Sequence, residues 1–174
     1  MKNIYIFLYF FSIFIVAENY EPFESTYEPL PPTNTIFRNA NIYDGEGNEL
    51  IDTDLIIKDG KVVAIGVDLP SSSDLKEIDA TDKWITPGII DIHSHMGVYP
   101  APSVKTSSDG NEATSPVTAE VWAEHSIWVQ DPQYALALKG GVTTFHVLPG
   151  SANLIGGRGV TAKNLQRNTI NSMK

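Results

Sequence analysis

Hydrophobic and polar residues alternate along several short segments after residue 34, a pattern typical of β-strands. Residues 36–43 (Ile-Phe-Arg-Asn-Ala-Asn-Ile-Tyr) predict one such strand. Residues 54–58 and 61–66 lie on either side of Asp59-Gly60. Asp-Gly between two such segments indicates a hairpin, because glycine adopts positive φ without steric cost. We therefore predict a small antiparallel β-sheet in this part of the chain.

A different pattern begins at residues 89–95 (Ile-Ile-Asp-Ile-His-Ser-His), which are apolar on both faces up to the histidines. This predicts a strand of a parallel sheet that is buried on both sides. After a long connection with one or two helical turns, Asp131 is the expected N-cap of a helix with Pro132 in its first turn. The Gly-Gly pair at 140–141 ends this helix, and residues 142–148 predict the next strand. Strand, helix and strand in this order form a βαβ unit, so the expected fold class is α/β.

The N-terminus has the features of an export signal. Lys2 precedes an apolar stretch at 4–17 that is too short to span a bilayer as a helix. We predict a signal peptide at 1–17 and a secreted product, with an uncleaved membrane anchor as the alternative. Residues 18–34 contain four prolines and predict an extended linker.

Charge and cysteine content narrow the possible functions. The chain has 12 Lys and Arg residues against 21 Asp and Glu residues, a formal net charge of −9. This balance repels phosphate backbones, so we expect no nucleic acid partner. The chain has no cysteine, which excludes disulfides, thiolate metal ligands and a cysteine nucleophile. Any metal must therefore be bound by histidine and carboxylate side chains.

His93 and His95 are the strongest candidates for such chemistry. Residues two apart in a strand point to the same face, and these two lie at the end of an apolar strand. Parallel strands of α/β folds present functional groups at their C-terminal ends. Neutral imidazoles are good ligands for zinc and similar ions. By itself the pair also fits two polar residues that are hydrogen-bonded or solvated at a strand end.

Residues 86–95 (Thr-Pro-Gly-Ile-Ile-Asp-Ile-His-Ser-His) resemble the signature of the amidohydrolase superfamily, a Pro-Gly turn, two apolar residues, Asp and His-x-His. Residues 59–66 resemble the small N-terminal β-domain of that family, and 140–144 resemble the start of its second barrel strand. Residues 148–157 resemble its imidazolonepropionase-like members. The resemblance extends from residue 35 to about residue 167.

The resemblance implies a small β-sandwich domain at 35–88, followed from residue 89 by a metal-dependent (β/α)₈ TIM barrel. It implies that His93 and His95 bind a divalent metal, with zinc as the first candidate. The implied reaction is hydrolysis of carbon–nitrogen bonds other than peptide bonds, typically in cyclic amides. The full-length form is expected to act on a small molecule, and the oligomeric state is left open.

The sequence departs from this family after the second strand. A (β/α)₈ barrel takes about 250 residues, many more than follow Asp91 here. The family's later metal ligands and its proton-transferring aspartate have no counterpart, so the catalytic residue is unknown. We expect 89–174 to be the first β/α units of an incomplete barrel and this chain to be inactive. The alternatives are a remnant with a binding or structural role, or half of a split barrel.

Four further residues are candidates for supporting roles. Asp91 is expected either to orient a ligating histidine or to bond nearby backbone. His125, close to two tryptophans in the long connection, is a candidate substrate contact. Arg158 lies in a Gly-Gly-Arg-Gly turn that lacks the lysine of a P-loop, and is a candidate contact for a substrate carboxylate. His146, within the second strand, is expected to have a packing or hydrogen-bonding role.

Overall fold

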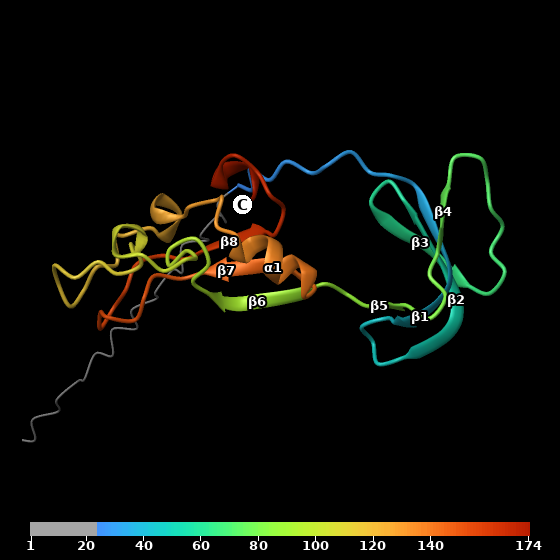
Figure 1. The fold of residues 1–174 in the computed structure, drawn as a ribbon, viewed down its shortest axis with the longest axis horizontal. Helices are drawn as coiled ribbons and strands as arrows, with labels where there is room; N and C mark the ends of the chain where they lie inside the picture. Colours follow the sequence, from blue (N-terminus) through green and yellow to red (C-terminus); the bar gives the residue numbers. More distant parts are fainter. Residues whose placement is uncertain (1–23) are drawn as a thin grey trace, which may run out of the picture.

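The computed structural model describes residues 24–174, so the predicted signal peptide and the start of the predicted linker lie outside the described residues. The described chain forms two lobes (Figure 1). We call residues 35–85 the β-lobe and residues 89–174 the barrel lobe. The extended segment that precedes the β-lobe and the short segment 86–88 both connect the two lobes (Figure 1).

The β-lobe is one sheet with the strand order β3-β2-β1-β4, in which β5 also pairs with β1. Strand β1 is antiparallel to β2 and parallel to β4 and β5. The predicted hairpin is confirmed, because β2 and β3 pair around Asp59 and Gly60, which have φ of 50° and 74°. The pattern did not predict β4 and β5, which are short. The five strands are β1 Thr35–Tyr43, β2 Glu49–Lys58, β3 Lys61–Gly66, β4 Lys76–Asp79 and β5 Trp84–Ile85.

Both faces of this sheet bury apolar side chains. Leu55 and Ile56 are consecutive in β2, so they point to opposite faces. Leu55 packs with Ile42 on one face, and Ile56 packs with Ile36 on the other. Such a sheet is the N-terminal portion expected of the predicted β-sandwich domain.

The barrel lobe contains the predicted βαβ unit. Strand β6 (Ile89–Ser94) is parallel to β7 (Val142–Val147), and helix α1 (Gln133–Lys139) precedes β7. The helix begins at Gln133, with Pro132 rather than Asp131 at the N-cap position. The correction is small, because Asp131 Oδ1 still accepts the Gln133 N–H at 3.0 Å. The remaining elements are the 3₁₀ helices Lys105–Ser107, Ala123–Ser126 and Ile170–Ser172 and strand β8 (Val160–Lys163).

Strand β8 was not predicted, and it runs antiparallel to β7. Its four residues (Val-Thr-Ala-Lys) follow a glycine-rich turn and do alternate between apolar and polar side chains, but the segment is too short to predict a strand. The three-stranded sheet has the order β6-β7-β8, so β7 is its central strand. The core of the lobe forms around Phe145, which is fully buried and contacts the Tyr134 ring at a centroid distance of 5.2 Å.

The prediction that the 89–95 strand is buried on both faces is wrong for this structure. The side chains of Ile89, Ile90 and Ile92 are 53%, 63% and 77% exposed. Within residues 24–174, β6 pairs only with β7, and its isoleucines face no covering layer. The apolar pattern of this strand indicates that its side chains favour burial, but no element within residues 24–174 covers them.

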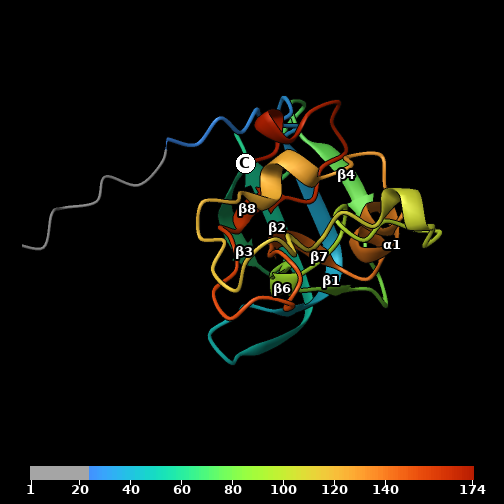
Figure 2. The same ribbon diagram turned by 90° about the vertical axis from the view of Figure 1, so that its left-hand side faces the viewer.

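The fold class is α/β: a small β-sheet domain precedes the first strands of an incomplete barrel. Figure 2, seen from the barrel-lobe side, shows β6, β7 and β8 in front of the β-lobe sheet. Across residues 24–174, no helix has the length and apolar character needed to cross a membrane.

Candidate metal site

Strand β6 brings its two histidines together as predicted. The strand ends at Ser94, so His93 is its second-last residue and His95 is the first residue beyond it. The imidazole centroids are 5.3 Å apart and the ring planes are at 83°. Zn–N bonds are about 2.0–2.1 Å long, so rings at this separation can reach one ion together.

The His95 ring is held by the neighbouring strand. Its Nδ1 lies 2.9 Å from the carbonyl oxygen of Leu148, the residue after β7. The Leu148 N–H in turn donates to the Ser94 carbonyl at 2.9 Å. Because a carbonyl can only accept, this bond places the proton of a neutral His95 ring on Nδ1 and leaves the Nε2 lone pair available. Metal-binding histidines in proteins are commonly oriented in this way.

Asp91 follows the second of its two predicted alternatives. Its Oδ1 accepts the backbone N–H of His93 at 3.1 Å. The carboxylate therefore holds the main chain of the strand rather than the imidazole of a ligand. Among the described residues, the ring nitrogens of His93 have no hydrogen-bond partner, so this ring is free to turn toward an ion.

Tyr99 is a part of the site that the sequence did not reveal. Its ring meets His95 edge to face at a centroid distance of 5.6 Å, and its hydroxyl accepts a hydrogen bond from the Asn111 side chain. Tyr99 lies in an irregular loop, where no periodicity indicates which side chains converge. Its short separation from His95 along the chain was the only available signal.

His125 and Arg158 both contact the Trp122 ring and lie away from the histidine pair. The His125 ring stacks on Trp122 at 6.3 Å and 24°, and the Arg158 guanidinium lies 4.7 Å from the Trp122 ring centroid. Within residues 24–174, no hydrogen bond or ring contact joins either residue to His93 or His95. The structure therefore does not bring the five predicted site residues into one cluster.

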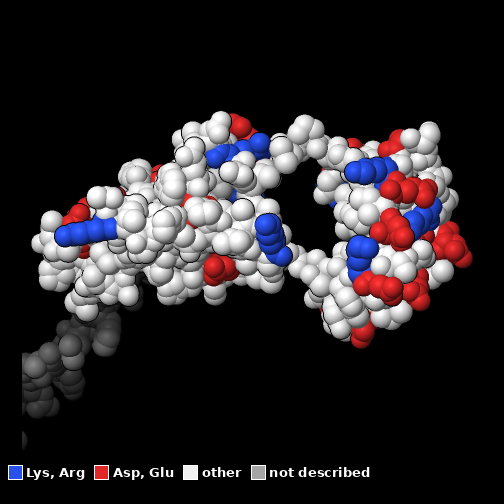
Figure 3. All heavy atoms as spheres, in the orientation of Figure 1, with Lys and Arg blue, Asp and Glu red and all other residues white. Residues whose placement is uncertain are grey.

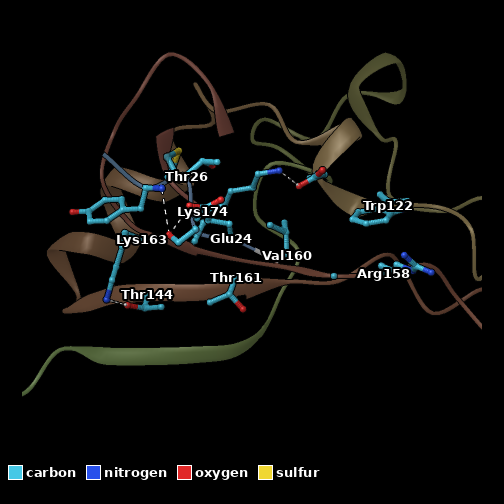
Figure 4. Close-up of a pocket in the computed structure, with 15 residues that line it drawn as sticks. Glu24, Thr26, Trp122, Thr144, Arg158, Val160, Thr161, Lys163 and Lys174 are labelled. Atoms are coloured by element: carbon cyan, nitrogen blue, oxygen red, sulfur yellow. Dashed lines mark hydrogen bonds and ion pairs between the residues drawn. The ribbon is translucent and has the colours of Figure 1, made fainter. Parts of the chain in front are cut away.

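Two pockets lie near these residues, and neither is lined by His93 or His95. A pocket of ≈ 600 Å³ beside β8 includes Arg158, and one of ≈ 490 Å³ includes His125. In the larger pocket the two lysines already have partners (Figure 4). Lys174 Nζ lies 2.7 Å from Glu124, and Lys163 Nζ donates to Thr144 at 3.2 Å.

His146 has the hydrogen-bonding role that the sequence predicted for it. Its Nδ1 lies 2.8 Å from the Thr161 hydroxyl across the β7–β8 pair. This bond leaves His93 and His95 as the histidines that the fold presents together. Within residues 24–174, no group of three or more histidine, aspartate or glutamate side chains is arranged to hold a metal. The donor set thus fits two of the three protein ligands that a catalytic zinc usually has.

No family model matches the chain. It is 34% identical over 146 residues to amidohydrolase tasK of Hapsidospora irregularis, which covers 74% of this chain and 15% of that protein. It is 40% identical over 63 residues to dihydroorotase of Ligilactobacillus salivarius, covering 35% of this chain and 14% of the relative. The matched part of the chain therefore spans about one seventh of each of these two relatives.

A solved structure, an amidohydrolase from Thermotoga maritima MSB8, aligns with a TM-score of 0.71 at 37% identity and covers 79% of this chain and 35% of that one. The described residues thus define an α/β protein of the barrel type, with two histidines at the end of the first strand of its barrel lobe. The chain belongs to the amidohydrolase superfamily. The imidazolonepropionase-like subgroup stays a prediction.

Proposed function

We propose that this chain is part of a metal-dependent hydrolase of carbon–nitrogen bonds other than peptide bonds, and that His93 and His95 are two of its metal ligands. The names of the relatives, an amidohydrolase and a dihydroorotase, support a hydrolase that acts on cyclic amides. The observation that carries the proposal is the histidine pair, with the His95 Nδ1 held at 2.9 Å by Leu148 and its Nε2 available.

Zinc is the first candidate for the ion, because the two available donors are imidazoles and the chain has no thiolate. When bound, a divalent ion supplies Lewis-acid polarisation of the substrate carbonyl and activation of water. The chain's own residues bind and orient: Leu148 fixes the His95 ring, and Asp91 fixes the main chain at His93. The Tyr99 ring packs edge to face against the His95 ring.

Cobalt titration of the 174-residue chain tests the ligand assignment, since Co²⁺ substitutes for zinc and has visible absorption bands. We expect Co²⁺ to bind the wild-type chain and binding to be lost in the His93→Ala, His95→Ala double variant. The matched control is the His125→Ala, His146→Ala double variant, which removes the other two histidines and should bind as wild type. Absence of binding by the wild type, or its loss only in the control, would contradict the assignment.

We further propose that this chain has no turnover by itself, because its described residues supply two imidazoles and no third ligand. The test is an assay with zinc or manganese against hydantoins, dihydropyrimidines and acyl-amino acids. Metal-dependent turnover that disappears in the His93→Ala, His95→Ala variant would overturn the expected inactivity while supporting the metal role.

A second candidate function is that of one part of a split barrel, which acts when another polypeptide covers β6. The exposure of Ile90 and Ile92 on an edge strand favours it. This candidate predicts that turnover appears only after a second chain with the missing ligands is added.

A further inference from the structure

The turn that follows His95 has no regular secondary structure, yet each of its backbone N–H groups donates a hydrogen bond. This turn, residues 96–101, begins with a bond back to the histidine, since the Tyr99 N–H donates to the His95 carbonyl at 3.0 Å. The Val98 N–H donates to the same carbonyl at 3.2 Å. The position of the His95 main chain therefore depends on the conformation of this turn.

A single carboxylate accounts for much of that conformation. Asp131 is 3% exposed and lies just before α1. Its Oδ2 accepts the Gly97 N–H at 2.9 Å, and its Oδ1 accepts the Ala101 N–H at 3.2 Å. The same carboxylate accepts the backbone N–H of Gln133 at 3.0 Å and its side-chain amide at 2.9 Å. One buried charge thus joins both ends of the turn to the start of the helix.

Two neighbouring side chains complete the attachment. The Gln133 side-chain amide also donates to the Tyr99 carbonyl at 2.9 Å, and the Tyr134 hydroxyl donates to the Met96 carbonyl at 3.1 Å. Burial, and after it the Asp131 carboxylate, raises the pKa of Tyr134 above its ordinary value, so the hydroxyl stays a donor. Only glycine fits at position 97, because its φ is 81° and a Cβ would overlap the Tyr134 hydroxyl.

We propose that Asp131, assisted by Tyr134, is a positioning residue for His95, because it clamps the turn at 96–101 to the start of α1. The inference rests on the proposed metal role of His93 and His95. His95 is then fixed from two sides: the Leu148 carbonyl holds its ring, and the clamped turn holds its main chain. Releasing the clamp lets the His95 backbone move and breaks the bond that sets the tautomer of its ring.

The test compares Asp131→Asn with Asp54→Asn in the full 174-residue chain. Asp54 is the matched control, because it is a buried carboxylate (4% exposed) that also accepts backbone N–H groups, but it lies in the β-lobe. The first readout is the ¹⁵N spectrum of the His95 ring in metal-free protein at about pH 8, above the ordinary histidine pKa. The second is Co²⁺ affinity, with the metal alone as the probe.

We expect Asp131→Asn to shift His95 from the Nδ1–H form toward a mixture of tautomers and to weaken Co²⁺ binding about tenfold. Tyr134→Phe removes only the hydroxyl bond to Met96 and should act in the same direction to a smaller extent. If Asp131→Asn does not fold, the Tyr134→Phe variant alone tests whether the clamp positions His95. Asp54→Asn should change neither readout.

Unchanged tautomers in the clamp variants, or an equal change in Asp54→Asn, would overturn the positioning role. If the wild-type chain binds no Co²⁺, the proposed function fails, whereas the tautomer comparison still decides whether Asp131 positions His95.

Discussion

Asp54 lies in β2 and connects three segments of the β-lobe. Its carboxylate accepts the Asn39 N–H at 3.0 Å, the Leu69 N–H at 3.1 Å and an Arg38 guanidinium N–H at 2.7 Å. Arg38 also donates to the Leu69 carbonyl at 2.7 Å. The bonds occur next to Asn39, which has a φ of 55° and interrupts the β1–β2 register. One charged side chain thus satisfies the Asn39 N–H at the irregularity in β1 and the Leu69 N–H in the loop after β3.

This arrangement predicts an acid-sensitive stability. Burial opposes ionisation of Asp54, but the bonds from Asn39, Arg38 and Leu69 outweigh it and hold its pKa below the ordinary value. A carboxyl whose pKa is lower in the folded state stabilises the fold above the unfolded pKa of about 3.9. We expect this contribution to be full above about pH 4 and to disappear as the pH falls through the folded pKa.

Urea unfolding at a series of acidic pH values measures the effect. The Asp54→Asn variant should be less stable than wild type near neutral pH, by about 1–3 kcal/mol, because the N–H donors lose a charged acceptor. The difference should shrink below about pH 4. A constant difference across the whole range would show that Asp54 does not carry the acid sensitivity.

Strand β6 has a neighbouring strand on one side only among the described residues, and its apolar side chains are exposed. Its inner partner β7 is central and buries Phe145 and Val147, while β6 lies at the edge of the sheet. An edge strand presents unpaired N–H and C=O groups, and exposed isoleucines add apolar surface to them. These are the properties of a segment that pairs with other chains when nothing covers it.

We therefore expect the 174-residue chain to self-associate through β6, and Ile92→Lys to reduce this association. Ile92 is 77% exposed, so a lysine there should cost little stability while adding a charge to the edge. Leu154→Lys is the control, because Leu154 is 84% exposed but lies in a loop. Sedimentation velocity gives the comparison, and equal effects of the two lysines would point to general charge repulsion instead.

At the scale of the molecule, residues 24–174 form two lobes with separate cores. No hydrophobic cluster of the described residues contains side chains from both lobes. Figure 3 shows a gap between the lobes that is bounded by the two connecting segments. On the face in that view, charged side chains gather over the β-lobe, and the barrel lobe is mostly uncharged (Figure 3). Lobes that share no core should unfold separately.

Phe145→Ala tests this separation. Removing a fully buried phenylalanine should destabilise the barrel lobe by about 3–5 kcal/mol, since it leaves a cavity. We expect amide hydrogen exchange to increase across β6 and β7 while β1 and β2 keep their protection. Ile42→Ala, in the β-lobe core, should give the reverse pattern. Loss of protection in both lobes from either variant would mean that they unfold as one unit.

Local patterns of the sequence were sufficient for the elements that depend on nearby residues. The Asp59-Gly60 hairpin, the βαβ unit and the end of α1 at the Gly-Gly pair follow from turn chemistry and side-chain periodicity, which act within a few residues. The His-x-His spacing likewise places two imidazoles on one face of a strand, because the period of a strand is two. These features needed no information about distant segments.

The tertiary structure decided the features that join segments far apart in the chain. Strands β5 and β8 are too short to be predicted from their own sequences. They form because β5 pairs with β1 and β8 pairs with β7. Asp131 reads as a helix cap from sequence, but only the fold brings Gly97 and Ala101 to the same carboxylate. His125 and Arg158 lie apart from His93 and His95 for the same reason: loop conformation is set by contacts with the rest of the molecule, which local sequence does not encode.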